Sequence, residues 1–202
     1  QGGDLSDPVV QATLKVVKVF WSLEDWLAYE RHFPAINWLT SYSLYHDSLR
    51  EYFRSEVSED WESMRVNAMK ILQQEADLKE IARLVGVDAL SNRDRLVLGT
   101  AKALREDFLH QNAFDDVDTY TSFPKQYGMI KNIMTFHRLS MDAVEQGVQT
   151  EALLNLPVNE DISRSRYIPE ADLANLEEIA GRIESQIRGL IQEKVGAEEP
   201  VA

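Results

Sequence analysis

Hydrophobic residues recur at alternating spacings of three and four along most of the chain after about Ser41, which is the pattern of helices that bury one face. The most regular of these seams holds Tyr127, Ile130, Met134, His137, Met141, Val144 and Val148. Similar seams run through residues 59–85, 91–108 and 173–190. Because helices that pack through such seams form antiparallel bundles, the pattern predicts a mainly α fold.

Cap and turn residues predict where these helices begin and end. Ser58 is placed to cap a helix that starts at Glu59, and Gly86 is a C-terminal stop for it. Ser91 opens the next helix. A Pro-containing connector over about residues 153–169 then leads to the last helix.

The first part of the chain has a different pattern. Residues 13–21 are rich in β-branched and aromatic side chains, and they predict the one convincing strand in the sequence. A single strand cannot satisfy its own edges, so the rest of its sheet is expected to precede Gln1, and the free edge favours self-association of the isolated chain. Residues 31–38, which are aromatic and interrupted by Pro34, predict an ordered loop.

The acidic composition narrows the range of functions. A net charge of −13 argues against binding nucleic acid and against docking on anionic lipid, because both need a basic surface. No apolar run approaches the roughly 20 residues that a membrane-spanning helix needs. Without cysteine the chain has no disulfide framework and no thiolate nucleophile. The simplest interpretation of such a surface is solubility.

Motifs for catalysis are missing from the sequence. There is no phosphate-binding G-x-x-x-x-G-K-S/T loop and no G-x-S-x-G nucleophile elbow. The histidines form neither an H-E-x-x-H motif nor a Glu-x-x-His pair, so no metal site is expected; they are His32, His46, His110 and His137. His137 lies within an apolar seam and is interpreted as a hydrogen-bonded interior group.

Two short segments carry residues suited to a planar ligand. Phe33 and Pro34 either cap a core or form one wall of a flat apolar slot, since aromatic faces stack on heterocycles. Farther along, Gln111 and Asn112 offer amides that can read a base edge, and Phe114 offers a second aromatic wall. The residues by themselves leave both interpretations open.

Several segments, read in order, resemble the catalytic A subunit of A-type and V-type rotary ATPases. The matching stretches are residues 2–9, 11–14, 19–21, 32–39, 111–114, 117–120 and 125–127. Residues 33–41 are also similar to Tyr-Pro-Ala-Val-Asp-Pro-Leu-Asp-Ser in the β subunit of F-type synthases. The resemblance runs from Gly2 to about Val148, and the last helix carries less of it.

The resemblance implies an adenine pocket in the full subunit, whose ligand would be ATP or ADP with Mg2+. Phe33 and Phe114 would be its two rings, Pro34 an apolar edge and Gln111 a polar neighbour. The phosphate loop, the magnesium-binding residues and the carboxylate that orients water would all precede Gln1, and a B subunit would supply an arginine in trans. The isolated chain is therefore expected to be inactive and to bind no cofactor tightly.

Residues 78–94 resemble the helix and acidic lever motif of the F-type β subunit, Asp-Glu-Leu-Ser-Glu-Glu-Asp, which faces the rotating stalk. This implies a rotor contact through Asp88, Leu90, Ser91, Asn92, Arg93 and Asp94. Ala89, Asn92 and Arg93 replace three acids of the motif, which puts a purely electrostatic push in doubt, although steric contact transmits torque without charge. A helix–turn–helix corner capped by Ser91 explains the same residues locally.

The predicted fold is a mainly α, C-terminal helical bundle with an N-terminal strand and loop remnant of an α/β nucleotide-binding domain. Residues 1–45 form the remnant, residues 46–195 the bundle and residues 196–202 a flexible acidic tail. Because the first residue is Gln rather than Met, the chain is expected to be cut from a larger subunit.

By resemblance, that subunit alternates with B subunits in an A3B3 hexamer around central stalk subunits. It would lie on the cytoplasmic side, peripheral to the cell membrane, and couple ATP synthesis or hydrolysis to proton or sodium transport. The alternative is a free-standing helical interaction or regulatory module without nucleotide chemistry. A helical metal enzyme would need convergent carboxylates and histidines, which the spacings do not supply.

Overall fold

Helices account for most of the 6–198 segment that the computed structural model describes. The α-helices are α1 (Pro8–Leu14), α2 (Asp25–Tyr29), α3 (His46–Glu56), α4 (Trp61–Val85), α5 (Asn92–Ala103), α6 (Phe123–Glu145), α7 (Thr150–Leu154), α8 (Val158–Arg164) and α9 (Ala174–Glu198). The shorter elements are the strands β1 (Val19–Phe20) and β2 (Tyr42–Ser43), the 3-10 turns η1 (Val87–Ala89), η3 (Ser165–Tyr167) and η4 (Glu170–Asp172), and a π-helical segment, η2 (Leu104–Leu109). The mainly α prediction is confirmed.

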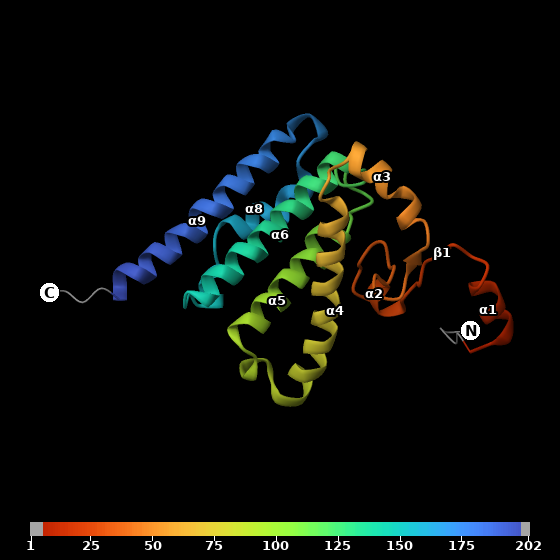
Figure 1. Cartoon of the computed structure of the whole chain (residues 1–202), viewed down its shortest axis with the longest axis horizontal. Helices are drawn as coiled ribbons and strands as arrows, with labels where there is room; N and C mark the ends of the chain where they lie inside the picture. Colours follow the sequence, from red (N-terminus) through yellow and green to blue (C-terminus); the bar gives the residue numbers. More distant parts are fainter. Residues whose placement is uncertain (1–5, 199–202) are drawn as a thin grey trace.

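The central helix of the bundle is α6, which packs against α5 on one side and α9 on the other (Figure 1). Buried apolar side chains of these helices and of η2 belong to the hydrophobic core, among them Leu96, Leu104, Ile133, Phe136, Ile183 and Ile187. The segment with α1, α2 and β1 lies beside the bundle, next to α4 (Figure 1). None of the helices within residues 6–198 is both long enough and apolar enough to cross a membrane.

The predicted ends at the corner between α4 and α5 are confirmed. Gly86 ends α4 with a φ of 87°, a backbone conformation that residues with a side chain rarely adopt. Ser91 caps α5, where its hydroxyl accepts the N–H of Asp94 at 3.1 Å. Local sequence chemistry therefore fixes this corner.

The predicted start of α4 is wrong. Asp60 rather than Ser58 is the N-terminal flanking residue, and the helix begins at Trp61 rather than at Glu59. The Asp60 carboxylate accepts hydrogen bonds from the Ser58 hydroxyl and, at 2.9 Å, from the phenol of Tyr127 in α6. The hydrogen bond between Asp60 and Tyr127 thus ties the start of α4 to α6, and the Ser58 side chain bonds to Asp60 instead of capping the helix.

The strand predicted over residues 13–21 is wrong over most of its length. Its first two residues belong to α1, whose start is fixed by Asp7 and Pro8. Oδ1 of Asp7 accepts the backbone N–H of Val9 at 2.7 Å, and Pro8 occupies the first helical position. This start signal carries the chain as helix through Leu14 in spite of the β-branched residues nearby.

The remaining strand is paired within the chain. β1 runs antiparallel to β2, with Val19 opposite Ser43 and Phe20 opposite Tyr42, and the two aromatic rings of that second pair stack with centroids 5.8 Å apart. The expectation of a strand without a partner is therefore wrong, and the helical pattern does not begin at Ser41. The edge predicted to favour self-association is only two residues long.

The predicted connector over residues 153–169 is largely helical, because it contains the end of α7 and all of α8. Buried apolar side chains of both helices, Leu153, Val158 and Ile162, join the core, and this burial orders the segment. The predicted tail begins inside α9, which runs to Glu198, and its remaining residues lie outside the described part of the chain.

A close approach of α6 and α9 at Gly128 gives a test of the packing. A Cβ on Gly128 would lie 2.6 Å from Cδ1 and 3.3 Å from Cβ of the buried Leu176. We expect Gly128→Ala to lower the free energy of unfolding by about 1–3 kcal/mol in urea denaturation, because the interface becomes overpacked. Gly181→Ala in α9 is the control: nothing lies within 4 Å of its Cβ, so a gain of up to about 1 kcal/mol is expected. Equal effects of the two substitutions would contradict this packing.

Candidate functional site

The Phe33 loop (residues 31–38) and the Phe114 loop (residues 110–118) lie in contact although they are distant in sequence. The backbone N–H of Gln111 donates a hydrogen bond of 2.7 Å to the carbonyl oxygen of Phe33. The residues Phe33 and Phe114 are 51% and 99% exposed. The structure therefore joins the two predicted ring-bearing segments through their backbones and leaves both side chains accessible.

His32 anchors the Phe33 loop. The side chain is buried, with Nε2 2.9 Å from the carbonyl oxygen of Arg105 in η2 and Nδ1 3.2 Å from that of Pro34. Its ring lies against those of Trp38 and His110, with centroids 5.6 and 5.1 Å away. Sequence reasoning gave His32 no such role, because only the fold brings the Arg105 carbonyl to it.

An ion pair attaches η2 to α4 beneath the Phe33 loop. Nε of Arg105 lies 3.1 Å from each carboxylate oxygen of Glu75, and both side chains are largely buried. Lys79 adds a second cation, with Nζ 2.9 Å from the same carboxylate. Because η2 supplies the carbonyl that holds His32, this pair also fixes the base of the loop.

Side-chain to backbone hydrogen bonds shape the Phe114 loop. Oδ1 of Asn112 accepts the N–H of Phe114 at 3.1 Å, and Oδ1 of Asp115 accepts two N–H groups further along at 2.9 Å each. The side-chain N–H of Gln111 donates to the carbonyl of Asp118 at 2.7 Å. One of the two side-chain N–H donors of Gln111 is thus engaged by the loop itself.

Burial lowers the pKa of two histidines. It lowers the pKa of His110, and the charge of Arg166 lowers that pKa further. Burial also lowers the pKa of His137, again with help from a nearby cation, Arg93. His137 Nδ1 lies 2.8 Å from the hydroxyl of Thr100, which confirms the prediction of a hydrogen-bonded interior group. Between residues 6 and 198 no group of three or more His, Asp or Glu side chains is arranged to hold a metal.

The corner (residues 86–94) lies at the free end of the α4–α5 hairpin (Figure 1). Several residues predicted to touch the rotor are engaged within the chain. Leu90 is buried, and the Ser91 hydroxyl donates to the Asp94 carboxylate at 2.6 Å. Arg93 forms an exposed ion pair of 2.7 Å with Glu145 at the end of α6.

Two further contacts clamp the corner to α7. The hydroxyl of Thr150 donates to the carbonyl of Asn92 at 2.7 Å, and Arg95 pairs with Glu151 at 2.7 Å. The other end of the Arg95 guanidinium donates to the carbonyl of Asp88 at 2.9 Å. The corner is therefore held as one piece against the ends of α6 and α7.

The surface of the corner and the last turn of α4 exposes apolar side chains beside polar ones such as Asp88 and Arg93. Leu84, Val85 and Val87 are 84%, 60% and 56% exposed. Leu84 and Val87 lie outside the predicted helical seam, and apolar residues outside a seam are the feature of the sequence that indicates an exposed apolar surface here. An apolar tip suits contact by shape rather than by charge.

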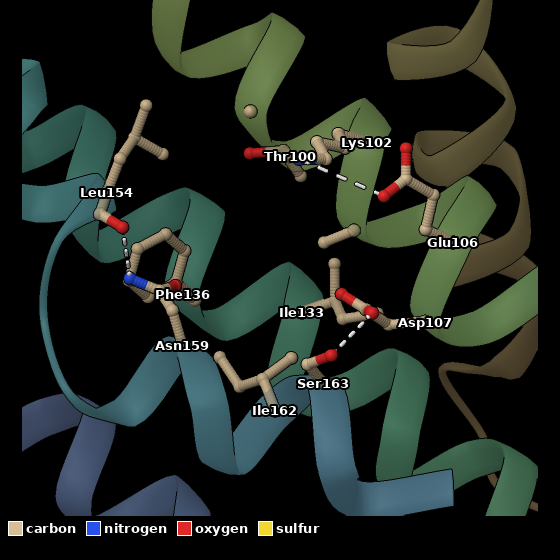
Figure 2. A pocket seen from close by; sticks show the side chains of 12 residues that line it. Thr100, Lys102, Glu106, Asp107, Ile133, Phe136, Leu154, Asn159, Ile162 and Ser163 are labelled. Atoms are coloured by element: carbon tan, nitrogen blue, oxygen red, sulfur yellow. Dashed lines mark hydrogen bonds and ion pairs between the residues drawn. The ribbon is translucent and has the colours of Figure 1, made fainter.

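A separate cleft of about 350 Å³ lies between η2 and α8 (Figure 2). Ile133, Phe136 and Ile162 line it with apolar surface, and Asp107 accepts a hydrogen bond of 2.8 Å from the Ser163 hydroxyl there. Burial raises the pKa of Asp107 above its ordinary value. None of the residues predicted for the adenine pocket lines this cleft, so it is a distinct feature.

Two family models match the sequence. One, described as the C-terminal domain of V and A type ATP synthase, matches residues 50–154. The other, described as the nucleotide-binding domain of the ATP synthase alpha/beta family, matches residues 1–43. The two matches meet near the predicted domain boundary at residues 45–46.

Curated relatives with high identity are V-type ATP synthase alpha chains. The chain is 56% identical over 191 residues to the alpha chain of Thermoanaerobacter pseudethanolicus, covering 95% of this chain and 32% of the relative. It is 54% identical over 195 residues to that of Acetivibrio thermocellus, covering 96% and 33%. The chain thus spans about a third of the length of these relatives.

A solved structure supports the fold. It is described as a unique ATP synthase subunit, NeqB, from Nanoarcheaum equitans, and it matches with a TM-score of 0.56 at 23% identity. The match covers 68% of this chain and 32% of that one. At this identity the likeness concerns the arrangement of helices alone.

The buried pair beneath the Phe33 loop gives one prediction. We expect Glu75→Gln to lower the free energy of unfolding by about 3 kcal/mol, because the largely buried Arg105 keeps only the more distant and more exposed carboxylate of Glu106, 3.8 Å away. The matched control is Glu160→Gln, which breaks an exposed pair of 3.2 Å with Arg164 and is expected to cost at most about 1 kcal/mol. Urea denaturation measures both, and a similar small loss in both variants would show that burial does not strengthen the Glu75 pair.

The buried carboxyl of the cleft gives a pH-dependent prediction. Since the folded pKa of Asp107 is raised, its contribution to stability is full below the unfolded pKa of about 4 and is lost as the pH rises through the folded pKa. Asp107→Asn cannot ionise, so its stability relative to the wild-type chain should increase over that window. Unfolding free energies measured from pH 4 to pH 8 would contradict the burial argument if the two curves ran parallel.

Proposed function

The chain belongs to the family of C-terminal domains of V- and A-type ATP synthases, and we propose that it works as part of the catalytic A subunit of a rotary ATPase. In this proposal the full subunit interconverts ATP with ADP and phosphate, and the chain contributes the adenine side of the nucleotide site. Phosphate chemistry lies elsewhere in the subunit, since the sequence has no phosphate-binding loop.

The observation that carries the adenine assignment is the hydrogen bond of 2.7 Å between Gln111 N–H and the Phe33 carbonyl. It brings together two loops that each present an accessible phenyl group, and a purine stacks favourably on such faces. Pro34 adds an apolar edge beside Phe33. Gln111 is a polar neighbour whose side-chain amide is oriented by its hydrogen bond to the Asp118 carbonyl.

The isolated chain is proposed to be inactive, because stacking alone does not position a phosphate for attack. ATP or ADP would bind with Mg2+ in the full subunit, where a magnesium ion and a trans arginine stabilise the charge of the transferred phosphoryl group. The residues of this chain would hold and orient the base, which is a contribution to affinity more than to the chemical step.

The corner is the proposed contact with the rotating central stalk. Asp88, Asn92 and Arg93 lie on it, while Leu90 supports it from inside. Because polar groups at this corner are already paired within the chain, the push is proposed to be steric, with the exposed apolar side chains of Leu84 and Val87 taking part. In this proposal the contacts of the corner with α6 and α7 are kept while the corner moves.

The wider assembly is proposed from the family to which the chain belongs. The subunit is proposed to alternate with B subunits in an A3B3 head around central stalk subunits, peripheral to the cytoplasmic side of the membrane. ATP synthesis or hydrolysis would be coupled there to transport of protons or sodium ions. The division of the chain at residues 45–46 into an end of the nucleotide-binding domain and a helical bundle belongs to the same proposal.

Removing the more exposed ring tests the adenine wall. In the assembled enzyme, Phe114→Ala is expected to weaken nucleotide binding about 5- to 150-fold, since stacking on one aromatic contributes about 1–3 kcal/mol, while kcat changes little. Equilibrium nucleotide binding and steady-state kinetics measure the two effects separately. Tyr120→Ala is the control, because it removes another exposed ring outside the proposed pair. Wild-type affinity in Phe114→Ala would refute the assignment.

A further inference from the structure

Arg166 holds the base of the Phe114 loop from a distant part of the chain. The residue lies in η3, and its side chain is buried. Nη1 donates to the carbonyl oxygen of Glu106 at 2.6 Å and to that of His110 at 3.1 Å. The first carbonyl belongs to η2 and the second to the first residue of the loop, so one guanidinium bridges the helical segment and the loop.

The same guanidinium faces a buried carboxylate at the other end of the Phe114 loop. Nε of Arg166 lies 3.4 Å from Oδ2 of Asp118, and the two side chains are 9% and 4% exposed. Oδ2 of Asp118 also accepts the backbone N–H of Asn112 at 2.6 Å. The backbone carbonyl of Asp118 accepts a side-chain N–H of Gln111. Since Gln111 donates in turn to the Phe33 carbonyl, one chain of contacts runs from Arg166 to both ring-bearing loops.

Lys125 fixes the position of Arg166. Its ammonium group donates to the carbonyl of Arg166 at 2.6 Å, and the residue has no exposed surface. Burial lowers the pKa of Lys125, while the carboxylates of Glu170, Asp118 and Asp115 oppose that shift. Because Lys125 lies in the first turn of α6, η3 is attached to the central helix of the bundle.

We propose that Arg166 is a positioning residue for the nucleotide base, which sets the place of the Phe114 side chain through Asp118 and the His110 carbonyl without touching the ligand. The inference rests on the proposed function of Phe33 and Phe114. Its contacts lie within the chain and need no ligand. The Phe33 loop has separate support from His32, so loss of Arg166 displaces one wall of the pocket and leaves the other.

The arrangement requires an arginine. A lysine keeps the charge, but its compact ammonium group does not reproduce the planar guanidinium, which donates to two carbonyls while its Nε faces a carboxylate at 3.4 Å. Arg166→Met removes the charge as well, so the buried carboxylate of Asp118 loses its ion-pair partner and keeps the electrostatic influence of Lys125. We expect the loop to open more often to hydrate that carboxylate. The expected order of loop stability is wild type, then lysine, then methionine.

The experiment uses the full subunit in its assembled complex. It compares the wild type with Arg166→Met and Arg166→Lys, and with Arg164→Met as a matched control, because the Arg164 guanidinium makes an exposed pair with Glu160. Amide hydrogen exchange over residues 110–118 measures the order of the loop. Steady-state kinetics with ATP measure KM and kcat.

We expect Arg166→Met to accelerate exchange in residues 110–118 and to raise KM for ATP by about 2- to 30-fold, with kcat within about twofold of wild type. The exchange rate and KM of Arg166→Lys should lie between those of the wild type and those of Arg166→Met, and Arg164→Met should match the wild type in both. Unchanged exchange in residues 110–118 would overturn the inference. A fall in kcat at unchanged KM would overturn it too, since that is the signature of a merely structural loss. If Arg166→Met fails to assemble, Arg166→Lys decides by the same two measurements.

Phe114→Ala separates this inference from the proposed function. Unaltered nucleotide affinity in Phe114→Ala contradicts the adenine wall itself. Weakened affinity in Phe114→Ala together with wild-type behaviour of both Arg166 variants contradicts only the role of Arg166. In the double variant, Phe114→Ala with Arg166→Met, the two effects on KM should not add, because a displaced loop no longer presents the ring.

Discussion

The packing of α6 between α5 and α9 is the constraint on which the rest of the structure depends. α6 buries apolar side chains towards both neighbours, and the small Gly128 lets Leu176 of α9 come close. Both ends of the helix are also attached to segments of the proposed function. Lys125 at its start holds the turn that supports the Phe114 loop, and Glu145 at its end pairs with Arg93 of the corner. Because interiors of this kind are close-packed, α6 fixes the distance between the two regions to which the proposed function refers.

Buried charges help to hold the two ring-bearing loops. A loop leaves many backbone groups without partners, and these must be satisfied before the loop can lie against a core. Arg166 satisfies two such carbonyls while it faces Asp118, and the pair of Glu75 with Arg105 fixes the segment beneath His32. Removing one partner of such a pair costs far more than breaking an exposed pair. The phenyl side chains can therefore stay exposed while the backbones that carry them are held in place.

The parts of the fold that sequence reasoning reached are those that local chemistry determines. The three-four seams predicted the long helices, and Gly86 and Ser91 marked the corner because each satisfies a backbone requirement of its own turn. The strand over residues 13–21 failed because Asp7 and Pro8 start a helix there, a local signal that outweighs β propensity. The short helices α7 and α8 were not predicted, because five to seven residues are too few to show a helical periodicity. Burial of their apolar side chains against the rest of the fold stabilises them. At the site, family resemblance selected Phe33 and Phe114. The supporting residues, above all Arg166, could not be found, because their partners are brought to them only by the fold.

The two proposed functional regions are joined mechanically within one chain. α6 has 23 residues, which corresponds to about 35 Å of helix. At one end the corner is tied to α6 by Arg93 and to α7 by the carbonyl of Asn92, so a displacement that keeps these contacts moves α6 as a body. At the other end Lys125 is buried, and its ammonium group donates to the carbonyl of Arg166. If Arg166 did not move with α6, this ammonium group would lose its hydrogen bond while it is shielded from solvent, which is costly. In the proposed function, a push at the corner would reach the support of the Phe114 loop by rigid-body movement, and it would require no acidic residue at the point of contact.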